Sequence, residues 1–336
     1  MVVEDQITMQ NRRMEYIDIY RGIGIVLMIM GHIGFGGKFD LWIHAFHMPM
    51  FFFISGFLHK NKDSFCELIK KKAKALLIPY LIFGIINYIA CSIIYRDWFN
   101  IGPLIHLITD NSDGLMISGA LWFLTALLWV YIIVFVLEKH IKNIKLKVFF
   151  IVLLSLFGML ETRILPFRLP LSLGISFVGV GLYYIGFFIA RNMSSKKVKY
   201  ILNLKKYQII LFGIIVTIFI FLNGYINMRL GIYQNFLLFW TNVIASCIIL
   251  LNISKQIEIE KNKLIQKIAA ILKYIGKNAI TYIVLNQLII LIIYKLLEGI
   301  TVKYIPNIIN FISTLAILFI INKIITNTKL KVLLGK

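Results

Sequence analysis

Charged residues and cysteines are both scarce in this sequence. Only 15% of its 336 residues are charged, a share too low for an ordinary soluble domain. The three cysteines, Cys66, Cys91 and Cys247, are scattered and form neither a C-x-x-C motif nor a Cys/His spacing. We therefore expect no disulfide framework and no structural zinc site.

Long apolar runs take the place of charge. The chain is 60% hydrophobic, with a mean hydropathy of +0.85, which indicates that lipid is its solvent. A membrane-spanning helix needs about 20 mostly apolar residues. Runs rich in Ile, Leu and Phe, separated by short Lys-bearing loops, predict an all-α, polytopic transmembrane bundle of about ten helices rather than a barrel. This bundle forms a single membrane-embedded domain, residues 1–336, with spans at 16–36, 41–58, 76–95, 119–137, 148–160, 171–190, 207–223, 236–252, 279–297 and 305–325.

The distribution of basic residues among the loops predicts the orientation. Lysine and arginine concentrate in alternate loops, at 60–74, 139–147, 191–206 and 255–277, whereas the loops between them hold little beyond Lys38, Arg96, Arg163, Arg168, Arg229 and Lys303. Because basic loops stay in the cytoplasm, we expect a multi-pass protein of the cytoplasmic membrane with both termini inside. The net charge of +21 is thus a topology signal, and we expect no nucleic-acid partner.

Two shorter segments add to this topology. The first apolar run, from Tyr16, lacks a following A-x-A cleavage site, so we expect it to be retained as a span. Within 255–277, Ile265, Ile268, Leu272 and Ile275 recur at helical spacing opposite lysines. They predict an amphipathic helix on the inner leaflet, with a solvated loop helix as the alternative.

Ionisable residues inside the spans are few, and each is a functional candidate because its burial in lipid is costly. The first span carries Asp18, Arg21 and His32. Eleven residues at about 100° each bring a helix back to within about 20° of its starting direction, so Arg21 and His32 share one face. They lie roughly 16 Å apart along the axis. Asp18 lies one turn before Arg21, where it could orient the guanidinium. The alternatives are an interfacial, snorkelling Arg21 and a His32 that only bridges helices through a hydrogen bond.

The second span carries His44 and His47, three residues apart. Two histidines at this spacing could bind a metal. No carboxylate or cysteine accompanies them in a recognisable ligand spacing. We therefore predict no metal and take packing as the default role of His44.

Several motifs together resemble a known family. They are Y-I-D-I-Y-R-G-I-G at 16–24 with Arg21-x10-His32, F-H-M-P-M-F-F-F-I-S-G-F at 46–57, A-L-W-F-L at 120–124 and I-G-K-N at 275–278. They resemble the acyltransferase 3 group of membrane-bound acyltransferases, with fucose 4-O-acetylase-like proteins most similar. One departure stands out. Many relatives carry a histidine about eight residues after the I-G-K-N asparagine, where this sequence has Asn286 and Gln287. Here an amide must do the work of that histidine, or the histidine is dispensable.

This resemblance implies O-acyl transfer, commonly of acetyl, from an acyl-CoA such as acetyl-CoA to a hydroxyl of a glycan or lipid-linked sugar. Arg21, with Asp18 beside it, is suited to bind the CoA phosphates near the inner mouth of the bundle. His32 is the expected catalytic residue, because histidine can act as a general base near neutral pH. Direct transfer and an acyl-histidine intermediate both fit.

Four further residues are expected to support the site. His47 would orient His32 or the substrate, and Trp122, Asn278 and Ser55 would contact the substrate. The alternatives are an interfacial aromatic anchor for Trp122 and a helix cap for Asn278. The competing function is an exporter of a polysaccharide or small molecule without acyl transfer. The sequence shows neither the inverted repeat nor the paired broken helices typical of transporters. A purely structural subunit would leave the Arg21 and His32 geometry unexplained.

Overall fold

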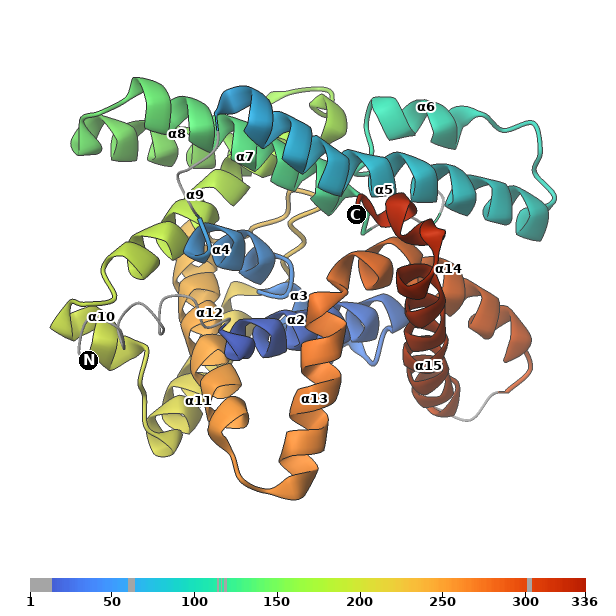
Figure 1. Ribbon diagram of the computed structural model, residues 1–336. Helices are drawn as coiled ribbons and strands as arrows, with labels where there is room; N and C mark the ends of the chain where they lie inside the picture. The colour runs from blue at the N-terminus through green and yellow to red at the C-terminus, as the bar shows by residue number, and fades with distance from the viewer. Residues whose placement is uncertain (1–13, 60–63, 114, 116, 118–119, 301–303) are drawn as a thin grey trace.

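The computed structural model describes residues 14–59, 64–113, 115, 117, 120–300 and 304–336, and within these ranges the fold is helical, with one isolated β-bridge (Figure 1). The α-helices are α2 (Glu15–Ile33), α3 (Gly37–His44), α4 (Pro49–Phe57), α5 (Phe65–Tyr95), α6 (Gly102–Ile108), α7 (Trp122–His140), α8 (Ile144–Ile164), α9 (Leu173–Arg191), α10 (Lys196–Ile201), α11 (Lys206–Asn223), α12 (Phe236–Ile259), α13 (Lys263–Lys277), α14 (Ala279–Leu296) and α15 (Ile305–Asn327). Two 3₁₀ segments, η1 (Pro170–Ser172) and η2 (Lys329–Leu334), complete the fold.

The all-α, polytopic bundle predicted from the sequence is confirmed. Of the described residues, eight helices are long and apolar enough to cross a membrane, where the sequence predicted about ten. One of the two remaining predicted spans, 148–160, lies in α8, which has 21 residues and charged residues near both ends. The start of the predicted span 119–137 includes a residue outside the described part of the chain.

The predicted second span, 41–58, is wrong as a single helix. It consists of the short helices α3 and α4, which are separated by a turn at 45–48. Proline has no N–H and favours the first position of a helix, and Pro49 begins α4 in this way. The turn holds His47, so the break in the helix decides where this side chain points.

Helix α2 is the centre of the bundle and packs against α12, α13 and α14. Its approach to α13 depends on glycine, because a Cβ at Gly22 would overlap the backbone carbonyl of Leu272, and one at Gly276 would overlap that of Asp18. Only the second part of the amphipathic helix predicted at 255–277 is therefore a separate helix, α13. Residues up to Ile259 continue α12, and α13 packs onto α2.

The Lys-rich segments meet at one end of the bundle. The backbone N–H of Tyr16 donates to Glu258 at 3.1 Å, and Lys206 pairs with Glu260 at 3.2 Å. Further contacts at this end join Glu15 to Lys273, Lys147 to Glu138, and Phe65 to Phe135. Some of the lysines that the sequence placed in loops lie on helices instead. The lysines at 70–74, for example, are part of α5, which is continuous from Phe65. Residues 60–63 and Lys303 lie outside the described part of the chain.

The Lys-poor segments meet at the other end. Arg168 donates to the carbonyl of Leu230 at 2.8 Å and pairs with Asp113 at 3.3 Å. Arg229 donates to the carbonyl of Ser112 at 2.8 Å. These contacts hold the loop between α11 and α12 over the end of α2 that carries His32.

Candidate functional site

Three predicted site residues, His32, His47 and Trp122, come together around one cavity of about 90 Å³. They come from the last turn of α2, the turn between α3 and α4, and the first residue of α7. The other lining residues are His44, Met48, Ala120, Asn227, Met228, Arg229 and Gln287. The cavity is named here the histidine cavity.

Asn286 on α14 sets the orientation and tautomer of His32. The Nδ2 group of Asn286 donates to the carbonyls of Tyr282 and Ile283, at 2.8 Å each. Its Oδ1 therefore faces His32, whose Nδ1 lies 2.6 Å away. Because an amide oxygen can only accept, Nδ1 carries the proton and Nε2 keeps its lone pair. The amide at the position where many relatives have a histidine thus leaves His32 with a basic nitrogen.

His44 and His47 are held in the same tautomer by backbone carbonyls. Nδ1 of His47 donates to the carbonyl of Ile43 at 3.0 Å, and Nδ1 of His44 donates to that of Asp40 at 2.7 Å. The two rings lie edge to face, with centroids 5.0 Å apart. Both Nε2 atoms remain acceptors. Within the described ranges, no group of three or more His, Cys, Asp or Glu side chains is arranged to hold a metal ion.

Trp122 is buried, with 2% of its surface exposed, and packs against Phe52 and Phe123. This burial favours a role at the cavity over an anchor at the membrane surface. Its contact with substrate stays a prediction.

Two further lining residues, Arg229 and Gln287, were not among the site residues predicted from the sequence. Arg229 was counted only as a loop charge, yet it brings a guanidinium to the histidines from a segment about 200 residues further along the chain. Gln287 has a buried Oε1 without a hydrogen-bond partner among the described residues. The sequence had flagged Gln287, together with Asn286, as one of two amides about eight residues after I-G-K-N, where many relatives carry a histidine.

Arg21 and Ser55 line a second, larger cavity of about 520 Å³ near the Lys-rich end of the bundle. Among the described residues, Lys71, Lys72 and Lys139 also line it, with one carboxylate, Glu138, so positive charge is in excess there. Its other lining residues are Leu58, His59, Leu68, Tyr131, Val134, Phe135 and Tyr183. We name it the cationic pocket.

Fixed side chains shape the walls of the cationic pocket. Nδ1 of His59 lies 2.6 Å from the hydroxyl of Tyr183, and the ammonium of Lys72 lies 3.8 Å from the centre of the Tyr131 ring. Ser55 donates to the carbonyl of Phe51 at 2.7 Å, so its hydroxyl oxygen can still accept. The pocket therefore offers donors and positive charge to an anion.

The two cavities lie along one face of α2, as the spacing of Arg21 and His32 predicts. Ile25 and Met28 occupy the same face between them, at helical spacing, and both are fully buried. The cationic pocket and the histidine cavity are therefore separate in this structure, and movement of these side chains would be needed to join them.

Asp18 and Asn278 line neither cavity. Asp18 is buried where α2 crosses α13. Asn278 ends α13, and its Nδ2 donates to the carbonyl of Tyr274 at 2.9 Å. This hydrogen bond caps the end of α13, whereas at the start of α14 the side chain of Asn278 makes no cap hydrogen bond. The ligand-binding roles of both residues stay predictions.

Comparison with known proteins agrees with the resemblance seen in the motifs. The nodulation protein NolL of Sinorhizobium fredii (strain NBRC 101917 / NGR234) is 30% identical over 136 residues, covering 35% of this chain and 35% of that protein. The nodulation protein NolL of Mesorhizobium japonicum (strain LMG 29417 / CECT 9101 / MAFF 303099) is 29% identical over 146 residues, covering 38% and 36%. The chain thus matches about a third of the length of these curated relatives.

The match to a family is far more extensive. The acyltransferase 3 family, described as an acyltransferase domain, matches residues 14–326. The narrower likeness to fucose 4-O-acetylase-like proteins stays a prediction. Since this match covers nearly the whole chain, including both cavities and every motif from 16–24 to 275–278, the chain belongs to the acyltransferase 3 family.

Proposed function

We propose that this protein is a membrane-bound O-acyltransferase that moves an acyl group, acetyl in our proposal, from acyl-CoA to a hydroxyl of a glycan or lipid-linked sugar. The observation that carries the proposal is the shared face of α2. Its Arg21 lines a cationic pocket and its His32 lines the histidine cavity. One helix thus connects a site suited to a polyanionic donor with a site suited to deprotonating an alcohol.

The cationic pocket is the proposed donor site. Coenzyme A carries phosphates, which guanidinium and ammonium groups bind through charge-assisted hydrogen bonds. Arg21, Lys71, Lys72 and Lys139 supply such groups in one cavity. Acyl-CoA is cytosolic, so the proposal requires the Lys-rich end to face the cytoplasm, as the positive-inside rule predicts for the cytoplasmic membrane.

The histidine cavity is the proposed acceptor site. His32 Nε2 takes the proton of the acceptor hydroxyl, and the oxygen attacks the carbonyl carbon of the thioester. The carbonyl oxygen becomes an oxyanion, which the guanidinium of Arg229 is suited to stabilise. When the carbon–sulfur bond breaks, the CoA thiolate leaves and takes the proton back from His32. An ester and free CoA result.

Transfer requires the acyl group to reach the histidine cavity from the cationic pocket. Ile25 and Met28 fill the face of α2 between the two sites. Methionine is flexible and adapts its shape easily. We propose that Met28 changes rotamer to admit the acyl end of the donor.

Radiolabelled acetyl transfer tests this function. Membranes containing the full chain are incubated with [¹⁴C]acetyl-CoA and glycan prepared from cells that lack the protein, and ester-linked label is measured after base treatment. Label on the glycan, lost in His32→Ala, supports the proposal. Glycan export without acetylation, at equal protein level, would instead support the exporter.

A further inference from the structure

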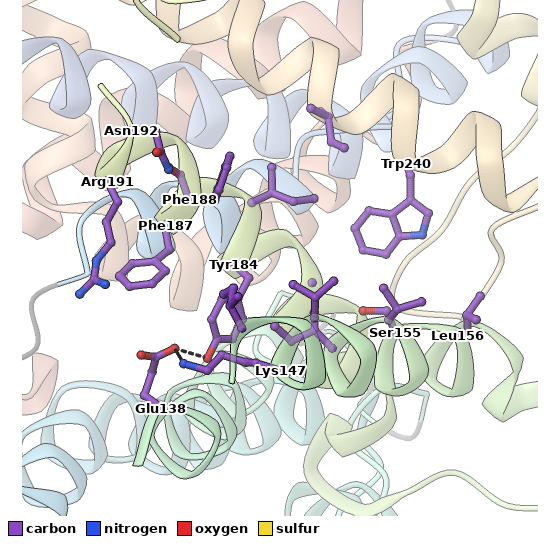
Figure 2. Close-up of a pocket in the computed structure, with 17 residues that line it drawn as sticks. Glu138, Lys147, Ser155, Leu156, Tyr184, Phe187, Phe188, Arg191, Asn192 and Trp240 are labelled. Atoms are coloured by element: carbon purple, nitrogen blue, oxygen red, sulfur yellow. Dashed lines mark hydrogen bonds and ion pairs between the residues drawn. The ribbon is translucent and has the colours of Figure 1, made fainter. Parts of the chain in front are cut away.

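A groove of about 610 Å³ on the outside of the bundle is not used by the proposed chemistry. It is bounded by α8, α9 and α12 (Figure 2). Its floor and walls are almost wholly apolar, and Val148, Val152 and Phe188 on its rim are half or more exposed. On a membrane-spanning protein such a surface faces lipid.

One end of the groove is polar and charged. Figure 2 shows Arg191, Asn192 and Phe187 together at this end, with Trp240, Ser155 and Leu156 at the other. The same end belongs to the Lys-rich side of the bundle, because α9 ends at Arg191 and α8 begins at Ile144. The groove therefore runs from the membrane surface into its interior.

Among the described residues, the mouth holds two cations, Lys147 and Arg191, and one carboxylate, Glu138, so positive charge is in excess there. Glu138 accepts hydrogen bonds from Lys147 at 2.7 Å and from the hydroxyl of Tyr184 at 2.8 Å (Figure 2). The guanidinium of Arg191 lies over the Phe187 ring, 4.5 Å from its centre. No carboxylate of the described residues lies within ion-pair distance of Arg191. The mouth thus attracts an anion.

The length of the groove is close to the depth of one leaflet. Its lining residues on α8 run from Ile144 to Leu156, and twelve residues of helix rise about 18 Å, enough to reach from the head-group level through one leaflet. Half of a hydrocarbon core of about 30 Å is about 15 Å. A lipid of the leaflet at the Lys-rich end would fill the groove with one acyl chain while its head group stayed at the surface.

We propose that this groove binds an anionic glycerophospholipid, with one acyl chain between α8, α9 and α12 and the phosphate beside Arg191. Glu138 lines both this groove and the cationic pocket, so the lipid would sit directly beside the proposed donor site. The inference rests on the groove and its charge, and it stands whether or not the proposed acyl transfer is correct.

Native mass spectrometry of the full chain tests the proposal. The protein, purified into mixed micelles with equal amounts of phosphatidylglycerol and phosphatidylcholine, should retain phosphatidylglycerol preferentially. Arg191→Gln should reduce this preference about fivefold, because one basic group at the membrane surface contributes about 1 kcal/mol to binding an anionic lipid. Arg191→Lys should keep it. Lys196→Gln, at the same end but not lining the groove, is the matched control.

A second pair of variants tests the acyl-chain site. Val152→Trp fills the groove and should reduce the number of retained lipids, whereas Leu153→Trp, equally exposed on α8 but outside the groove, should not. Equal retention of the two lipids by the wild-type protein, or an unchanged preference in Arg191→Gln, would overturn the proposal. Displacement of phosphatidylglycerol by an equal amount of a polyprenyl phosphate would also overturn the proposal, because it would identify a polyprenyl phosphate as the preferred occupant of the groove.

Discussion

Replacing His32 by glutamine is expected to separate proton transfer from helix packing. In the structure, Nδ1 of His32 donates to Asn286 Oδ1 at 2.6 Å and thereby links α2 to α14. The amide of glutamine can donate to the same oxygen, so His32→Gln can keep this link. The glutamine amide cannot take a proton from an alcohol, however. The protein should therefore fold and insert normally while acyl transfer is lost.

The size of the loss follows from the role. Removing a positioned general base typically costs a factor of about 10²–10⁴ in rate, and His32→Gln should lie in this range, close to His32→Ala. Asn286→Leu removes the acceptor that fixes the tautomer, leaves the part-buried Nδ1–H of His32 without this partner, and also removes the hydrogen bonds from Asn286 to Tyr282 and Ile283. An unmade buried hydrogen bond costs about 1–3 kcal/mol. This variant should retain the base but hold it poorly, with a smaller loss of activity and a lower melting temperature.

The assay is the initial rate of [¹⁴C]acetyl transfer in membranes at matched protein level, with thermal unfolding of the purified variants measured in parallel. His47→Ala serves as the comparison, because a supporting residue should cost less than the base. If His32→Gln acylated the glycan at nearly the wild-type rate, His32 would be only a bridge between helices. His47 would then be the next candidate for the base.

Four further predictions concern the donor, the oxyanion, the helix crossing and the topology. Arg21→Lys should raise the KM for acetyl-CoA and leave that for the acceptor nearly unchanged, since a bidentate fork becomes a point charge; a change in the acceptor KM alone would refute the donor role. Arg229→Gln should lower kcat by about 10²–10³ if the guanidinium stabilises the oxyanion, and a change confined to KM would restrict it to binding. Gly276→Ala should destabilise the protein by about 1–3 kcal/mol in thermal or denaturant unfolding, because the new Cβ meets the Asp18 carbonyl. Gly213→Ala, where a Cβ meets nothing within 4 Å, is the control and should be neutral or stabilising. A reporter fused after Lys206 should be active only in the cytoplasm, and activity outside the cell would contradict the proposed orientation.

The sequence by itself determined the class of the protein and the face of α2 on which the two candidate sites lie. Apolar runs of spanning length can only be helices in lipid, because every backbone polar group must be bonded within the segment. The shared face of Arg21 and His32 follows from helix periodicity alone, and in the structure each lines a cavity along α2. These are local properties, so they can be obtained from residue spacing.

The break in the second span was only partly accessible to sequence reasoning. Proline at 49 is a visible signal for a helix start, yet the apolar residues on both sides made 41–58 resemble one span. The turn at 45–48 places His47 at the cavity and sets its hydrogen bond to Ile43. Hydropathy measures how apolar a segment is, and it does not distinguish one helix from two.

Only the tertiary structure decided which distant groups complete the two sites. Asn286 lies 254 residues from His32 in sequence, and its amide is oriented by two carbonyls of its own helix. Arg229 reaches the histidine cavity because its loop is tied to Ser112. No periodicity or charge pattern in the sequence predicts that Asn286 contacts His32 or that Arg229 lines the histidine cavity. Both depend on how α2, α14 and the α11–α12 loop pack, which is a balance of contacts summed over the whole bundle.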